Sequence, residues 1–257
     1  MEWDNESLKL FLEEKVAQYN TLDFISDDPI QLPHQFTSKE DIEIIGFLVA
    51  TIAWGNRKMI IKNGKKMLQL MGNAPYDFIL SHNKKQLDRL DTFVHRTFNG
   101  VDFKYFIQSL RNIYTKHNGL ESIFIQHQSD TSLLPAISAF HSIFFELSHE
   151  FRTEKHIANP EKGSVAKRIN MFLRWMCRKD NCGVDFGIWA IHPSKLSCPL
   201  DVHSGNIARA LGLITRKNND LKALQELDAT LRKFDPQDPV KYDFALFGLG
   251  VNNELDL

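Results

Sequence analysis

Apolar side chains recur every three or four residues along most of the chain, which is the spacing of one buried face of an α-helix. The segments with this spacing are predicted as helices, and they are 7–18, 38–53, 57–71, 103–114, 131–151, 164–179, 204–213, 220–234 and 240–248. No segment shows the sustained alternation of polar and apolar residues that β-strands joined by hairpin turns require. We therefore predict an all-α fold.

Residues at the predicted helix starts have the chemistry of N-caps. Ser38 is followed three residues later by Asp41, which is a capping arrangement, and the helix after it is apolar on almost every side, so it is predicted to be central. Asp201 follows Pro199 and precedes the apolar positions of segment 204–213. Its carboxylate is expected at the positive end of that helix. On spacing alone, Asp201 is a helix cap.

The length of 257 residues is sufficient for one large domain or for two lobes. We treat residues 1–257 as a single helical unit. The polar segment 156–163, which contains Pro160 and Gly163, is the best candidate for a boundary between lobes. There is no internal repeat and no low-complexity tract.

The composition is that of an ordinary soluble globular protein, with 43% hydrophobic and 25% charged residues. No apolar run reaches the roughly 18–20 residues needed to span a bilayer, so no membrane association is expected. The first residues, Met1-Glu2-Trp3-Asp4, lack the basic and apolar regions of a signal peptide. An odd number of cysteines, three, favours a reducing compartment, and the cytoplasm is expected.

The formal net charge of −1 does not by itself indicate a nucleic-acid-binding protein. Locally, however, segment 154–179 has seven Lys and Arg residues against two Glu. Lys167, Arg174 and Arg178 recur there at steps of seven and four, which places them along one side of the predicted helix. Such a side is compatible with DNA binding and equally with a solvated helix face.

Two segments resemble the helix-hairpin-helix DNA glycosylase superfamily. The run Leu200-Asp201-Val202-His203, with the sequence that follows to Leu213, resembles its D-x-H segment. The run Lys167-Arg168-Ile169-Asn170-Met171-Phe172 resembles the lysine-bearing helix of the archaeal 8-oxoguanine glycosylases, and Lys167 precedes Asp201 by 34 residues. The resemblance implies a two-lobed, all-α, glycosylase-like fold with a degenerate helix-hairpin-helix.

The chain as a whole is similar to an uncharacterised bacterial family of hypothetical proteins. The phrases that mark this similarity are Ala53-Trp54-Gly55-Asn56-Arg57, Phe172-Leu173-Arg174-Trp175-Met176 and Tyr242-Asp243-Phe244-Ala245-Leu246-Phe247-Gly248. This similarity covers nearly the whole chain. It brings an expectation of fold and no established activity.

The superfamily resemblance implies a DNA base-excision glycosylase and lyase that acts on a flipped, damaged base. In that interpretation the Lys167 amine attacks the sugar C1′, the ionised Asp201 stabilises the cationic sugar, and the cations Arg168 and Arg174 lower the pKa of the amine. The remaining candidates line a base pocket or contact DNA, and they are Trp54, Asn56, Arg57, Trp175, Arg178, Trp189, His203 and Arg209. The partner implied is nucleic acid, most simply DNA.

The sequence also departs from the superfamily pattern. Segment 182–189 has glycines but lacks the Pro-Gly step of the phosphate-gripping hairpin, and Asn206 stands where an arginine is usual. Three scattered cysteines exclude the four-cysteine iron–sulfur type, and Cys182 and Cys198 with His192 or His203 match no zinc pattern. We expect no metal and no cofactor.

Structural interpretations of the same residues stay open. In these, Asn56 only follows a helix break at Gly55, the tryptophans only pack in the core, and His203 has only a structural role. The alternative functions are a non-catalytic DNA- or RNA-binding protein with the same fold, and an enzyme acting on tRNA or a small molecule. The oligomeric state is not predicted.

Overall fold

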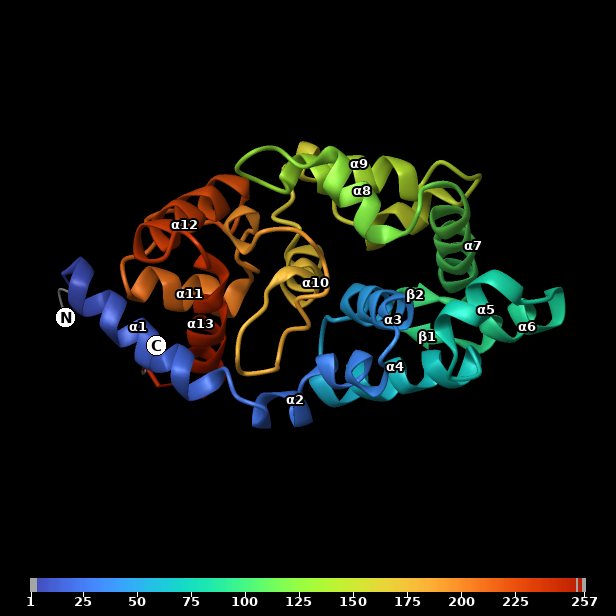
Figure 1. The fold of residues 1–257 in the computed structure, drawn as a ribbon, viewed down its shortest axis with the longest axis horizontal. Coiled ribbons are helices and arrows are strands. Elements are labelled where there is room, and N and C mark those ends of the chain that lie inside the picture. Colours follow the sequence, from blue (N-terminus) through green and yellow to red (C-terminus); the bar gives the residue numbers. More distant parts are fainter. Residues whose placement is uncertain (1–3, 253, 256–257) are drawn as a thin grey trace. The chain divides into compact units, whose positions relative to one another are not determined.

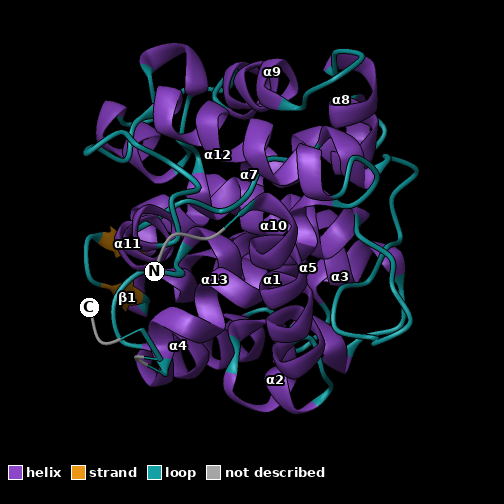
Figure 2. Ribbon diagram, turned by 90° about the vertical axis from the view of Figure 1, so that its left-hand side faces the viewer, coloured by secondary structure: helices purple, strands orange, loops and turns teal. Residues whose placement is uncertain are grey.

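The computed structural model describes residues 4–252 and 254–255. It is predominantly helical, and the strands of the described residues are the two short strands β1 (Val94–His95) and β2 (Phe98–Asn99), which pair antiparallel (Figures 1 and 2). The prediction of an all-α fold is confirmed. The hairpin turn between the strands holds Arg96 with a positive φ of 54°.

The chain divides into two compact units. Unit 1 comprises Met1–Phe24, Gln128–Pro135 and Asn159–Leu257, and unit 2 comprises Ile25–His127 and Ala136–Ala158. One passage between the units lies between Ala158 and Asn159, inside segment 156–163, for which the sequence predicts a lobe boundary.

Unit 1 is built on five longer α-helices. They are α1 (Asn5–Tyr19), α10 (Lys167–Cys177), α11 (Val202–Ala210), α12 (Leu221–Phe234) and α13 (Tyr242–Val251). The short 3-10 turns of this unit are η5 (Pro160–Lys162), η6 (Pro193–Lys195) and η7 (Pro239–Lys241). Helix α13 packs against α1 and α11 (Figure 1). Leucines from α12, at positions 224, 227 and 231, are fully buried in the same core as Leu246 of α13.

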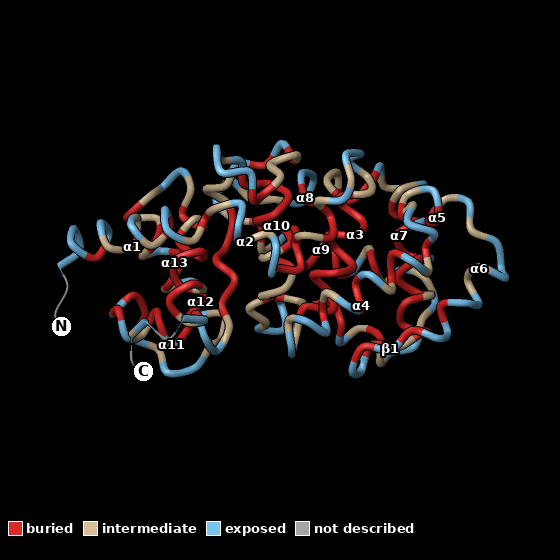
Figure 3. Tube along the Cα trace, turned by 90° about the horizontal axis from the view of Figure 1, so that it is seen from below, coloured by how far each residue is buried: buried red, intermediate tan, exposed pale blue. Residues whose placement is uncertain are grey.

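Unit 2 surrounds one apolar helix. Its helices are α3 (Lys39–Thr51), α4 (Arg57–Leu70), α5 (Pro75–Ser81), α6 (Lys84–Asp88), α7 (Gly100–Lys116) and α8 (Leu120–His127), with the 3-10 turns η1 (Pro29–Gln31), η2 (Pro33–Gln35), η3 (Arg89–Thr92) and η4 (Phe151–His156). Every residue of α3 from Ile42 to Thr51 is buried, as predicted for a central helix, whereas α6 is largely exposed (Figure 3). The ring of Phe47 lies 5.8 Å from that of Phe106, which anchors α3 on α7.

Two helices lie where the chain passes between the units, α2 (Asp23–Asp27) and α9 (Leu134–Phe144). The predicted helix 131–151 is too long, because α9 ends at Phe144. The carbonyl of Phe144 accepts hydrogen bonds from the hydroxyls of Tyr105 (2.7 Å) and Ser109 (2.6 Å). Tertiary hydrogen bonds at its last residue therefore take part in ending this helix.

The starts of two other helices show how local signals act. Ser38 caps α3, and its side chain accepts from the backbone N–H of Asp41, as predicted. Helix α10 begins at Lys167 and not at residue 164, because Ala166 has a left-handed conformation with φ 48°. That turn fixes the direction in which Lys167 leaves the backbone.

Candidate active site

Asp201 is the N-cap of α11, as its sequence context predicts. Its Oδ1 accepts hydrogen bonds from the backbone N–H groups of His203 (2.8 Å) and Ser204 (3.0 Å). In return, the hydroxyl of Ser204 accepts from the backbone N–H of Asp201 (2.9 Å), which completes a capping box. The caps occupy Oδ1, so the other carboxylate oxygen, Oδ2, is available for a second interaction.

That second interaction is with Lys167. The first residue of α10 places its Nζ 3.2 Å from Oδ2 of Asp201. The two side chains keep 30% and 33% of their surface accessible. The structure thus brings together the two residues that the sequence predicts as nucleophile and acid, and both side chains remain partly accessible to solvent.

The surroundings of Asp201 keep its carboxylate ionised. Burial alone would raise its pKa, but the nearby Lys167 ammonium and the N–H groups of Ser204 and His203 outweigh burial, and the pKa lies below its usual value. A carboxylate of this kind stays negative at neutral pH. It is suited to stabilise a positive charge that develops beside it.

A second acidic residue, Asp243 of α13, interacts electrostatically with this pair. It is buried and paired with the Nη1 of Arg174. Burial raises the pKa of Asp243 to about 6, although Arg174 and Lys167 act in the opposite direction. The charge of Asp201 adds to the increase, so Asp243 belongs to the same electrostatic cluster. The thiol of Cys198 lies 4.0 Å from Asp243 Oδ1.

Asp243 was not among the residues predicted for the site. A signal was available, because this is the one acidic residue of the predicted helix 240–248 and it stands between two aromatic residues, Tyr242 and Phe244. An acidic residue on such a helix is buried only when it has a partner.

Arg174 and Arg178 lie in the interior of unit 1 and not on a solvated face. Each keeps only 3% of its surface exposed. The carboxylate of Asp185 joins them, with Oδ1 3.2 Å from Arg174 Nε and Oδ2 3.1 Å from Arg178 Nη1. Both guanidinium groups also lie over the ring of Phe244, at 4.3 and 5.3 Å from its centre. The prediction that Lys167, Arg174 and Arg178 form one exposed basic side is therefore wrong for the two arginines.

The arginine Arg209 acts on Asp201 indirectly. Its Nη2 donates to the side-chain carbonyl of Asn219, and its Nε donates to the backbone carbonyl of Arg216 (2.7 Å). Asn219 in turn donates from Nδ2 to the backbone carbonyl of Asp201 (2.7 Å). Arg209 therefore supports the turn that carries Asp201.

The other candidate residues of unit 1 range from fully buried to exposed. Trp175 is fully buried and Trp189 is 4% exposed, with its ring 5.4 Å from that of Phe172. His203 lies exposed in the first turn of α11. Arg168 is half-buried, and burial lowers its pKa to about 10. A role for these residues in a base pocket stays a prediction.

Three candidates belong to unit 2. Asn56 caps α4, where its Oδ1 accepts from the N–H of Met59 (3.2 Å), and Arg57 is the first residue of that helix. Trp54 is half-buried, and its ring lies edge-on to His95 at 4.9 Å. Asn56 therefore lies in the connection between α3 and α4 as a helix cap, and a role in reading a base stays a prediction.

Nothing among the described residues forms a group of three or more His, Cys, Asp or Glu side chains that would hold a metal ion. Cys182 is an exposed free thiol, whereas Cys198 is buried. No described helix is both long enough and apolar enough to cross a bilayer.

The fold and the site define an all-α protein in which a capping aspartate is paired with a lysine at the start of a second helix. The family described as "Protein of unknown function (DUF2400)" matches residues 28–252, and the chain belongs to this family. The matched range contains Lys167, Asp201 and Asp243. No curated protein and no solved structure matched the chain.

Proposed function

We propose that this protein is a DNA base-excision glycosylase with lyase activity, in which Lys167 is the nucleophile and Asp201 the electrostatic acid. The observation that supports the proposal is the distance of 3.2 Å between Lys167 Nζ and Asp201 Oδ2, in a pair that solvent can reach. The resemblance of the two segments to the glycosylase superfamily supplies the reaction class.

The chemistry assigns one task to each residue. The neutral amine of Lys167 bonds to C1′ of a flipped nucleotide while the bond from C1′ to the base breaks. The electron pair of that bond leaves with the base, which takes up the proton that the amine loses. Opening of the sugar ring then gives a Schiff base, loss of a C2′ proton expels the 3′ phosphate, and the strand is cut.

Asp201 acts on the charge of this reaction. The sugar becomes cationic as the base departs, and a carboxylate whose pKa is lowered remains negative beside it. In the resting protein Lys167 is held in an ion pair with Asp201, and that pair must open before the amine can attack. Binding of the nucleotide must therefore separate Lys167 from Asp201 and desolvate the amine, which favours its neutral form.

Trapping with borohydride tests the proposal. The wild-type protein, incubated with duplexes that carry an abasic site or one of a panel of damaged bases, should give a stable covalent adduct after reduction. Lys167→Ala should abolish the adduct and leave binding of the duplex intact. Lys179→Ala, at an exposed lysine that follows α10 in the same unit, should trap like the wild type.

Absence of an adduct across the whole panel, or trapping by Lys167→Ala at the wild-type level, would overturn the proposal. The alternative of a non-catalytic DNA- or RNA-binding protein is favoured by one feature, the ion pair that holds Lys167 in its unreactive form. Under that alternative, Asp201→Asn binds nucleic acid like the wild type and neither protein is trapped.

A further inference from the structure

Helix α4 concentrates the positive charge of unit 2. Residues 44–76 contain no Asp or Glu but hold five basic residues, Arg57, Lys58, Lys62, Lys65 and Lys66, all of them on α4. The remainder of the chain has 26 basic and 32 acidic residues, so its formal charge is −6. A polyanion that approaches the protein is therefore attracted to this helix.

Three of these lysines are not engaged by the protein. Lys58, Lys62 and Lys65 are exposed, and no described residue forms a hydrogen bond or an ion pair with them. Lys66 differs, because its Nζ donates to the backbone carbonyl of Thr92 (2.7 Å). We call Lys58, Lys62 and Lys65 the α4 lysines. Their ammonium groups are available to a ligand.

The α4 lysines share one face of the helix. Their spacing of four and three residues places them one above the other along the axis. The opposite face is buried, with Ile60, Met67 and Leu68 in the core of unit 2, and the helix packs against α3. Because this apolar face is occupied, α4 cannot insert into a lipid surface as an amphipathic anchor does.

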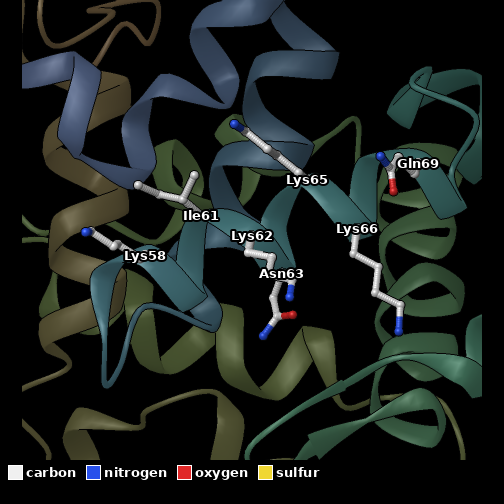
Figure 4. A pocket seen from close by; sticks show the side chains of 7 residues that line it. All are labelled: Lys58, Ile61, Lys62, Asn63, Lys65, Lys66 and Gln69. Carbon is white, nitrogen blue, oxygen red and sulfur yellow. The ribbon is translucent and has the colours of Figure 1, made fainter.

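A hollow of about 510 Å³ runs along the lysine face. Its lining includes the α4 lysines together with Ile61, Asn63, Lys66 and Gln69 (Figure 4). In this view Lys58 lies at one end of the helix, and Lys65 and Lys66 point to opposite sides of it, so the positive charges do not converge on one point. A single small anion would meet one or two of them, whereas an extended chain of phosphates would meet them in succession.

We infer that the lysine face of α4 binds the phosphate backbone of a nucleic acid. Successive turns of α4 are about 5.4 Å apart, which is similar to the roughly 6.8 Å that two nucleotides of one strand span along a DNA duplex. Contacts of this kind position the nucleic acid and carry no sequence information. The identity of the polyanion rests on the proposed function, but the charge and geometry of the face do not.

Salt-dependent binding tests the inference. The α4 triple variant carries Lys58→Gln, Lys62→Gln and Lys65→Gln, and its binding to an undamaged labelled duplex is compared with that of the wild type by fluorescence anisotropy. Each lost phosphate contact lowers the slope of log K against log salt by about 0.9. The slope should therefore fall by about 2.7, so that a change from about 50 to 200 mM salt weakens the variant about 40-fold less than the wild type.

A matched control removes the same charge elsewhere in unit 2. Lys84, Lys85 and Lys116 are also exposed, and the control triple variant changes all three to Gln. The control should keep the wild-type slope. Equal slopes for the wild type and the α4 triple variant would overturn the inference, as would an equal loss in both triple variants or binding to anionic vesicles in place of the duplex. If the α4 triple variant does not fold, Lys62→Gln alone should lower the slope by about 0.9.

The outcome is separable from that of the proposed function. If the protein binds the duplex through the α4 lysines but is never trapped by borohydride, the phosphate-binding role of α4 stands and the proposed lyase activity is wrong. If the wild type is trapped at Lys167 but the α4 triple variant binds the duplex normally, the proposed lyase activity stands and the phosphate-binding role of α4 is wrong.

Discussion

The side-chain amide of Asn219 donates a hydrogen bond to the backbone carbonyl of Asp201 at 2.7 Å, and Asn219 itself lies against Gly205. A Cβ at position 205 would lie 2.5 Å from Oδ1 of Asn219. The first turn of α11 therefore needs glycine at this position, because Asn219 occupies the space of a side chain. Through the backbone carbonyl of Asp201, Asn219 supports the turn that carries the carboxylate.

Gly205→Ala should displace Asn219 and loosen the turn that carries Asp201. We expect a lower yield of borohydride trapping, although alanine has the higher helix propensity. Gly250→Ala in α13 is the matched control, because its Cβ would meet only ordinary contacts of 3.5 Å or more. The control should be neutral or stabilising by about 0.5–1 kcal/mol in urea unfolding. Full trapping by Gly205→Ala would show that Asn219 does not position Asp201.

Asp201 combines a structural and a chemical role, and two substitutions separate them. Asp201→Ala removes the cap and should lower the free energy of unfolding by about 0.5–2 kcal/mol. Asp201→Asn keeps a capping side chain, so it should be nearly as stable as the wild type while losing the charge that the reaction uses. Denaturant unfolding and trapping, measured on both variants, check this. A fully active Asp201→Asn protein would refute the electrostatic role.

The ionisation of Asp201 also predicts an acid limb of stability. Its pKa in the folded protein lies below the ordinary value of 3.8, so the folded state favours the charged form. The resulting stabilisation is fully present above the unfolded pKa and is lost as the pH falls through the folded pKa. Unfolding experiments below pH 4 should show a smaller loss of stability for Asp201→Asn than for the wild type. Parallel curves for the two proteins would contradict this account.

Ionisation of Asp228 in α12 should make the free energy of unfolding depend on pH with the opposite sign. It is buried, its Oδ1 accepts from the backbone N–H of Cys198 (2.9 Å), and burial raises its pKa to about 6. The folded protein therefore holds a proton that the unfolded chain releases between about pH 4 and 6, and the free energy of unfolding should fall as the pH rises through that range. The raised pKa of Asp243 acts in the same direction.

Asp228→Asn removes one of these two contributions. Its stability should vary less between pH 4 and 6 than that of the wild type, by an amount on the order of 3 kcal/mol. Thermal or urea unfolding across this range measures the difference. An unchanged pH profile would show that Asp228 titrates near its ordinary value.

Removing Arg174 should destabilise the protein, because it leaves a buried carboxylate unpaired. Its removal leaves Asp243 without its guanidinium partner in the interior of unit 1, and leaves Asp185 paired with Arg178 alone. Arg174→Ala should therefore lower the free energy of unfolding by about 3–5 kcal/mol. Lys179→Ala, at an exposed site, should change it by less than about 0.5 kcal/mol. A stable Arg174→Ala protein with weakened DNA binding would instead support a contact with DNA.

Local patterns predicted the parts of the site that depend on neighbours in sequence. The cap at Asp201 follows from its place before an apolar helix, and Ser38 follows the same rule. The burial of Arg174 in α10, and of Arg178 directly after it, could not be predicted in this way. Spacing places Lys167 and Arg174 on one side of a helix, but the acidic partner Asp185 lies in a segment without helical periodicity. Only the tertiary fold shows that Arg174 is covered while Lys167 stays partly accessible.

Asp243 and the α4 lysines were missed for related reasons. The environment of Asp243 is created by Arg174 from a distant helix, so its sequence context gives only the warning of an acid among apolar residues. The count of basic residues favoured segment 154–179, but two of its arginines are buried in ion pairs. Charge that is available to a ligand depends on burial and pairing, which a count along the sequence does not measure.

Peptide mapping of the reduced adduct tests the central claim most directly. The wild-type protein is trapped with borohydride on a duplex that carries an abasic site, digested, and analysed by mass spectrometry. The account predicts that the sugar is attached to Nζ of Lys167, and that Lys167→Ala gives no modified peptide. Attachment at another residue, or no adduct at all, would contradict it.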